Sequence, residues 1–87
     1  MRITKKQLEQ MVNVINTRTG AAKEYRTNGT INIGHYHIDH AYGGVKLVRT
    51  MNNGGGIVDI SRDGYETKRE LYRFLDGFIA GLENSGQ

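Results

Sequence analysis

The sequence predicts an α+β fold in which a helix, an antiparallel sheet of three or four strands and a second helix follow in order, with both helices packed on one face of the sheet. Three observations predict it. Apolar residues recur with helical spacing towards both ends of the chain, they alternate as in a strand between these ends, and turn residues divide the middle into short segments. With 87 residues, of which 37% are hydrophobic, the chain can form one core, so we expect a single domain over residues 1–87.

The first helix is expected to begin after Thr4 and to end near Thr19. Thr4 and Gln7 have the spacing of a capping box, and Gly20 can adopt the left-handed conformation that ends a helix. Between them lies one apolar stripe with helical spacing, made of Leu8, Met11, Val12 and Ile15.

The second helix is expected to begin after Thr67, which forms another capping box with Glu70, and to run to about Glu83. Its apolar face holds Leu71, Phe74, Leu75, Phe78 and Leu82. Small residues adjoin this face at Gly77, Ala80 and Gly81. Because a glycine inside a helix costs about 1 kcal/mol relative to alanine, they indicate a close backbone approach, either within the domain or at a dimer or partner contact.

The middle of the chain has the period of strands. Asn28 and Gly29 form a strong hairpin signal, so strands at 22–27 and 30–39 are expected to pair. A β-bulge at Gly34 would restore one apolar face to the second strand. Further strands are expected at 45–51 and from residue 57, joined by a hairpin turn at "NNGGG". The sheet half of the core is expected to contain Ile31, Ile33, Val45 and Leu47.

The composition excludes several classes of function. The absence of cysteine removes disulfides, thiolate zinc ligands and a thiol nucleophile. Neither Ser61 nor Ser85 stands in a nucleophile motif, so no enzyme activity, catalytic residue or cofactor is expected. No apolar run approaches the ~20 residues that span a bilayer, so we expect a cytoplasmic protein without a membrane partner. The net charge of +3 favours approach to phosphate or an acidic protein surface.

All three histidines lie in "GHYHIDH". With the bulge in place, His35 and His37 share one face of a strand, and His40 lies just past its end. Such a cluster can bind a metal, but it also occurs on solvated or hydrogen-bonded strand faces, and it can form a pH-sensitive contact surface. We favour structural histidines and expect no metal.

Both helix starts carry basic residues after the capping threonine, in "TKK" and "TKR". Cations are disfavoured there by about 0.3–1 kcal/mol because of the helix dipole. If the helices run side by side, these residues form one positive edge; if they are antiparallel, the two groups lie apart. We expect this edge to contact an acidic protein surface or phosphates through Lys5, Lys6, Lys68, Arg69 and Arg73, joined by Tyr65 and Tyr72.

The segments "YHIDHAYGGVKLVRTMNNGGG" and "KRELYRFLDGFIAGLE" resemble a group of small proteins encoded by tailed phages and prophages. The resemblance covers about the C-terminal two thirds of the chain, and of the three histidines it includes only His37. It implies an accessory protein that binds a host protein or defence complex, as anti-CRISPR inhibitors do. The first of these two segments suggests a second contact surface at Tyr36, His37, Tyr42 and Arg49.

The order of elements also resembles that of double-stranded-RNA-binding domains, in which basic residues at the start of the last helix contact phosphates. Lys68, Arg69 and Arg73 occupy similar places here. A nucleic-acid-binding module is therefore the alternative to a protein-binding one, although no loop that would enter a minor groove is recognisable.

Overall fold

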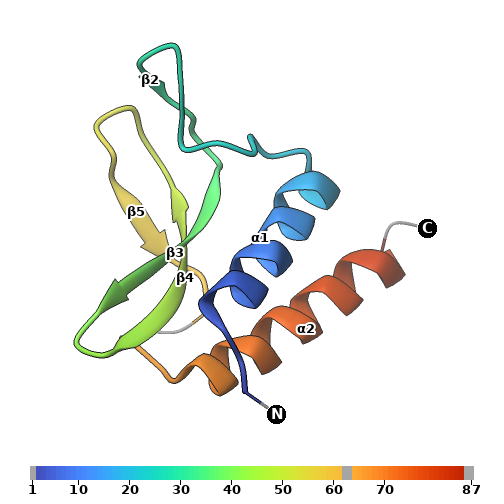
Figure 1. The fold of residues 1–87 in the computed structure, drawn as a ribbon. Coiled ribbons are helices and arrows are strands. Elements are labelled where there is room, and N and C mark those ends of the chain that lie inside the picture. Colours follow the sequence, from blue (N-terminus) through green and yellow to red (C-terminus); the bar gives the residue numbers. More distant parts are fainter. Residues whose placement is uncertain (1, 62–63, 86–87) are drawn as a thin grey trace.

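The computed structural model describes residues 2–61 and 64–85, which form two helices and five strands (Figure 1). Along the chain these are α1 (Lys5–Thr19), β1 (Arg26–Thr27), β2 (Thr30–Ile31), β3 (Tyr36–Ala41), β4 (Gly44–Thr50), β5 (Ile57–Asp59) and α2 (Lys68–Ser85). Strands β3, β4 and β5 form an antiparallel sheet in that order, and both helices lie on the same side of it (Figure 1). The predicted α+β class and element order are confirmed.

Both helices begin at the predicted capping boxes. In α1 the Gln7 N–H donates to Thr4 Oγ1 at 3.1 Å, and Gly20 ends the helix in the left-handed conformation with φ 75°. At α2 the Glu70 N–H donates to Thr67 Oγ1 at 3.1 Å. The Thr67 N–H donates back to Glu70 Oε1 at 2.9 Å. Each box satisfies backbone donors that a helix N-terminus otherwise leaves unpaired.

The predicted strand at 30–39 is wrong, because the chain turns in the middle of it. The N–H of Gly34 donates to Thr50 O at 2.8 Å and the N–H of Thr50 donates to His35 O at 3.0 Å, so two residues oppose one. With Gly34 at φ 94°, this is the predicted β-bulge, of the type that starts with a left-handed glycine. The bulge redirects the chain, so β1 and β2 form a separate two-stranded ribbon instead of extending the sheet.

The core lies between the helices and one face of the sheet. Most of the predicted core residues are buried there, namely Leu8, Val12, Ile15, Leu71, Leu75, Val45 and Leu47. Met11, Phe78 and Leu82 pack around them and are half-buried. Ile33 was a wrong prediction, since 56% of it is exposed at the turn before the bulge. Ile31 was also wrong, since it lies in the ribbon formed by β1 and β2 and does not pack in this core. Tyr36, which faces the helices from the start of β3, takes its place in the core.

The helices run side by side in the same direction (Figure 1). An ion pair of 3.1 Å between Arg18 and Glu83 joins their C-terminal ends, and their N-terminal turns lie together at the opposite end. Of the two arrangements considered for the basic residues, the structure has the one that brings them together. Gly77 and Gly81 are exposed, and an added Cβ would meet nothing within 4 Å at either, so close packing within the domain does not explain them.

Replacing Leu75 by alanine should lower the free energy of unfolding by about 2–5 kcal/mol, because the side chain is fully buried and leaves a cavity. Urea unfolding followed by circular dichroism measures this. The control Ile33→Ala, at an exposed position, should cost less than about 0.5 kcal/mol. Equal losses in the two variants would contradict the assignment of the core.

Candidate functional site

The β3–β4 hairpin ends in a two-residue turn at Tyr42 and Gly43, which we call the hairpin tip. Both residues have positive φ, 53° and 74°, as a type I′ turn requires. A bulky side chain is rarely found in this conformation, which costs a residue with a Cβ about 1–2 kcal/mol. Tyr42 is nonetheless 96% exposed, so burial of its ring in the core does not compensate for this cost.

The base of the hairpin is fixed against the chain that leads into α2. Val45 and Glu66 exchange two backbone hydrogen bonds of 2.8 Å. At Gly44 an added Cβ would lie 2.8 Å from the Cβ of Tyr65, so only glycine fits there. The ring of Tyr65 in turn packs edge-on against that of Tyr42, with 5.6 Å between ring centroids. The exposed ring therefore projects from a well-supported position.

Two clefts lie beside the hairpin where it meets the start of α2. One has a volume of about 580 Å³ and is lined by His40, Ala41, Gly43, Gly44, Val45, Thr67 and Lys68. The other, of about 430 Å³, is lined by Tyr42, Gly43, Gly44, Tyr65, Glu66, Thr67 and Glu70. We call the hairpin tip, Tyr65 and these two clefts the hairpin–helix end. It combines an exposed aromatic ring with concave surface on either side.

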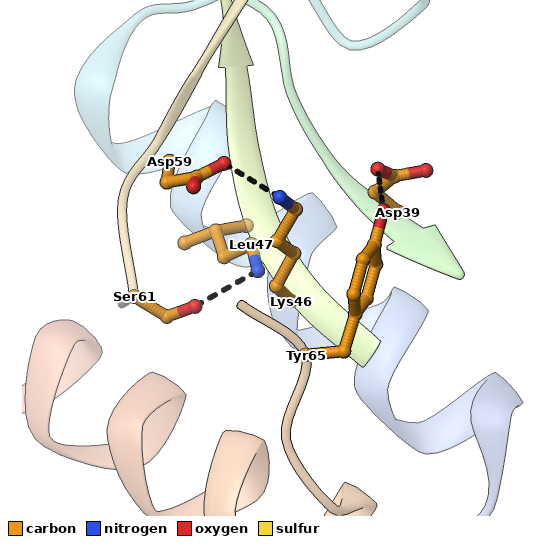
Figure 2. A network of polar contacts seen from close by, with 6 residues as sticks. All are labelled: Asp39, Lys46, Leu47, Asp59, Ser61 and Tyr65. Carbon is orange, nitrogen blue, oxygen red and sulfur yellow. Dashed lines mark hydrogen bonds and ion pairs between the residues drawn. The ribbon is translucent and has the colours of Figure 1, made fainter. Parts of the chain in front are cut away.

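A polar network on the sheet face away from the helices holds Tyr65 in place (Figure 2). The Tyr65 hydroxyl donates to Asp39 Oδ2 at 2.7 Å, and the Lys46 ammonium lies 4.6 Å from the centre of the Tyr65 ring. Lys46 also forms an ion pair of 2.9 Å with Asp59. Strands β3, β4 and β5 each contribute one of the three charged residues, so the network ties the whole sheet to Tyr65.

This network favours the protonated forms of Lys46 and Tyr65. The hydrogen bond to Asp59 raises the pKa of Lys46, and the hydrogen bond to Asp39 raises the pKa of Tyr65. At neutral pH neither group is prepared to act as a base or a nucleophile. The network is suited to positioning the ring of Tyr65, and not to proton transfer.

The predicted basic residues are exposed, and one of them, Lys68, lines the larger cleft. The shared direction of the helices places the first turn of α1 beside that of α2 (Figure 1). We call these residues the basic edge: Lys5, Lys6, Lys68, Arg69 and Arg73. Of the two tyrosines predicted to join it, Tyr72 is half-buried against the core, and Tyr65 packs with Tyr42 instead.

The histidines do not converge on one point. The rings of His35 and His37 are stacked, with 5.5 Å between their centroids. Tyr25, the residue before β1, packs its ring edge-on against both. His35 Nδ1 also donates to Ala22 O at 2.8 Å. His40 lies on the other face of β3, where it lines the larger cleft. Within residues 2–61 and 64–85 there is no group of three histidines or carboxylates that could hold a metal ion.

Two residues of the predicted second contact surface, Tyr36 and Arg49, are held by contacts within the fold. Tyr36 is only 7% exposed and belongs to the core, so it is not part of an exposed surface. The Arg49 guanidinium lies over the Tyr36 ring, 5.0 Å from its centre, and its Nε donates to Gly34 O at 3.2 Å. Arg49 therefore supports the bulge. Tyr42 is the exposed member of this set.

Sequence reasoning missed the network around Lys46. The signal was available, because Asp39 and Lys46 face each other across the predicted hairpin and share a face with His37. Opposite charges directly across an antiparallel pair stabilise it by roughly 0.2–1 kcal/mol.

No family model, curated protein or solved structure matches this chain. Of the helices in the part of the chain that the structure describes, neither is long and apolar enough to cross a membrane.

Stability should fall as pH is lowered below about 6.5, the ordinary pKa of histidine. Burial lowers the pKa of His37, and the nearby charge of His35 lowers it further, against a smaller opposite effect of Asp39. Between the lowered value and 6.5 the unfolded chain binds more protons than the folded one, so acid favours unfolding. Above this window the folded state retains its full stability.

Melting temperatures measured between about pH 7.5 and pH 5 test this. The fall should be smaller in His37→Gln than in the wild type. The control His40→Gln, at an exposed position on the other face, should keep the wild-type fall. The same pH profile for wild type and His37→Gln would rule out His37 as its origin.

Proposed function

We propose that this is a small non-catalytic binding protein, encoded by a tailed phage or prophage, which acts in the host cytoplasm on a host protein or defence complex. The observation that carries the proposal is the hairpin tip, where Tyr42 is almost fully exposed in a strained conformation. Exposed tyrosines on rigid supports are typical of protein interfaces, because they give a large contact area at a small cost in conformational entropy.

The resemblance to phage proteins supports the hairpin tip as the contact surface. Among the residues that carry it are 41–45, which form the hairpin and its flanks, and 68–71, which form the first turn of α2. These two segments are far apart in the sequence and adjacent in the structure, where both line the larger cleft. A shared contact surface is one reason for such segments to be alike.

The basic edge supports an acidic partner surface. Five exposed cations lie in the first two turns of the helices, which begin side by side (Figure 1). Complementary charge around an aromatic contact speeds association and selects the partner, more than it adds affinity.

A nucleic-acid partner is the second candidate. Two helices running in the same direction on one face of a three-stranded sheet, with basic residues at the start of the last helix, favour it. The two-residue turn between β3 and β4 weighs against it, because it leaves no loop to reach into a minor groove. We therefore rank a protein partner first.

Replacing Tyr42 by asparagine should weaken partner binding at least about tenfold, as expected for the loss of an aromatic hot spot. The free energy of unfolding should change by less than about 1 kcal/mol. Asparagine tolerates positive φ, and this relief of backbone strain offsets the lost contact with the Tyr65 ring. Affinity purification from host extract, with and without nuclease, followed by calorimetry on the isolated partner, measures both. An unchanged affinity would remove the hairpin tip from the interface, and a partner lost on nuclease treatment would favour nucleic acid.

Reversing charge with Lys68→Glu and Arg69→Glu should weaken binding at low salt, and the loss should shrink as salt screens the charges. The unfolding free energy should not fall, because acidic residues suit the positive end of the helix dipole. The control Arg26→Glu, on the exposed β1–β2 ribbon, should leave binding within about threefold of wild type. Equal effects of the two changes would mean that overall charge, and not the basic edge, controls binding.

A further inference from the structure

Strand β3 is an edge strand, because among the described residues it pairs with β4 alone. Along an antiparallel strand, successive residues direct their backbone groups to opposite sides. Ala41 pairs with Gly44 across the two-residue turn, so Ala41, Asp39 and His37 bond to β4. The alternating residues Tyr36, Ile38 and His40 direct their N–H and C=O groups away from the sheet.

Helix α1 pairs the first of these outward residues. Asn16 Oδ1 accepts the Tyr36 N–H at 2.9 Å, and Asn16 Nδ2 donates to Tyr36 O at 3.0 Å. The amide thus bonds to Tyr36 as a neighbouring strand would. In the described part of the chain, no group hydrogen-bonds to the outward N–H or C=O of Ile38 or His40. These four groups can pair with an added strand.

A cavity of about 320 Å³ lies beside this edge. Its lining comes from the start of β3 and from the α1 residues Glu9, Val12 and Asn13, with Lys23. The larger cleft, lined by His40 and Lys68, lies at the other end of the strand. An open strand edge with a helix alongside and room for side chains is the arrangement that receives extended peptides in β-augmentation.

We propose that the β3 edge binds an extended segment of the protein partner, which adds a fourth strand to the sheet. This inference rests on the proposed function, since it assumes that the partner is a protein. The segment forms backbone hydrogen bonds with Ile38 and His40, and its three residues opposite Ile38, Asp39 and His40 are apolar, basic and acidic.

The chemistry of each position gives this order. The side chain opposite Ile38 faces the helices and can enter the cavity beside Val12 and Tyr36. The side chain of the segment opposite Asp39 lies on the outer face beside the Asp39 carboxylate, where a cation is favoured. The side chain opposite His40 lies beside His40 and Lys68, which favour an acidic group.

A second copy of this chain fits the edge less well. Pairing Ile38 with His40 of another copy places the two Asp39 carboxylates opposite each other, which is destabilising. Pairing Ile38 with Ile38 requires the backbone groups of Tyr36, which Asn16 already occupies. Pairing His40 with His40 extends into the turn at Tyr42, where the strand has ended.

The test uses peptides selected for binding to the full chain from a random library displayed on yeast, each about a dozen residues long. The selected peptide should slow hydrogen exchange at the Ile38 and His40 amides and shift their NMR signals. N-methylation of a peptide residue whose N–H faces β3 should weaken binding about tenfold, the loss of one hydrogen bond with its partner left unpaired. N-methylation of the residues on either side should leave the affinity within about threefold.

A pair of protein variants separates backbone from side chain. His40→Pro removes an outward N–H at a strand edge, where proline is tolerated, and should weaken binding about tenfold. His40→Ala keeps the N–H and removes only the ring beside the acidic residue of the peptide, so it should weaken binding by no more than about threefold. If His40→Pro does not fold, the N-methylated peptides still decide.

The inference is overturned if no peptide is selected, or if the selected peptides shift the NMR signals of amides outside β3. It is also overturned if N-methylation weakens binding equally at every position. Dimers seen by sedimentation, with the Ile38 and His40 amides protected in the absence of peptide, would overturn it as well. A host protein that needs Tyr42 but leaves the β3 amides unchanged overturns this inference alone and leaves the proposed function standing.

Discussion

One buried amide, that of Asn16, fixes how α1 meets the sheet. It is fully buried, and it satisfies both backbone groups of Tyr36 at the start of β3. Only one placement of the helix along the strand allows both bonds, and that placement directs Leu8, Val12 and Ile15 of α1 to the core. Losing the amide would leave two buried backbone groups unpaired, at a cost of about 1–3 kcal/mol each. The positions of the basic edge and of the open part of β3 both follow from it.

The elements that the sequence predicted correctly are those with local causes. A capping box, a hairpin turn or a left-handed glycine requires residues within about four positions of one another, so Thr67 with Glu70 and Asn28 with Gly29 are recognisable in the chain itself. The bulge at Gly34 was also predictable. The path of the chain before this bulge was not predictable, because it depends on contacts with residues distant in the sequence. Here the residues before Gly34 leave the sheet and form the separate ribbon of β1 and β2.

The site was predictable in part. The cations of the basic edge were visible as a repeated violation of the helix-dipole preference, but whether they meet depended on the relative direction of two helices. Tyr42 entered the predicted contact surface through the resemblance to phage proteins. Its place before two glycines, where a turn favours glycine or asparagine, is a local conflict that also marks the position. The sequence did not show that the Tyr42 ring would be so exposed, since exposure depends on how the hairpin lies against the start of α2.

The pairing of α1 with α2 has a consequence for how the chain folds. The apolar stripe of α1 is completed by residues more than sixty positions later, and the Arg18–Glu83 ion pair spans 65 positions. Folds that depend on such distant contacts form slowly, because the loop must close before the contacts stabilise it. On the ribosome α1 emerges first and cannot bury Leu8 against Leu71 and Leu75 until α2 has been made. The growing chain therefore exposes this stripe until α2 has emerged.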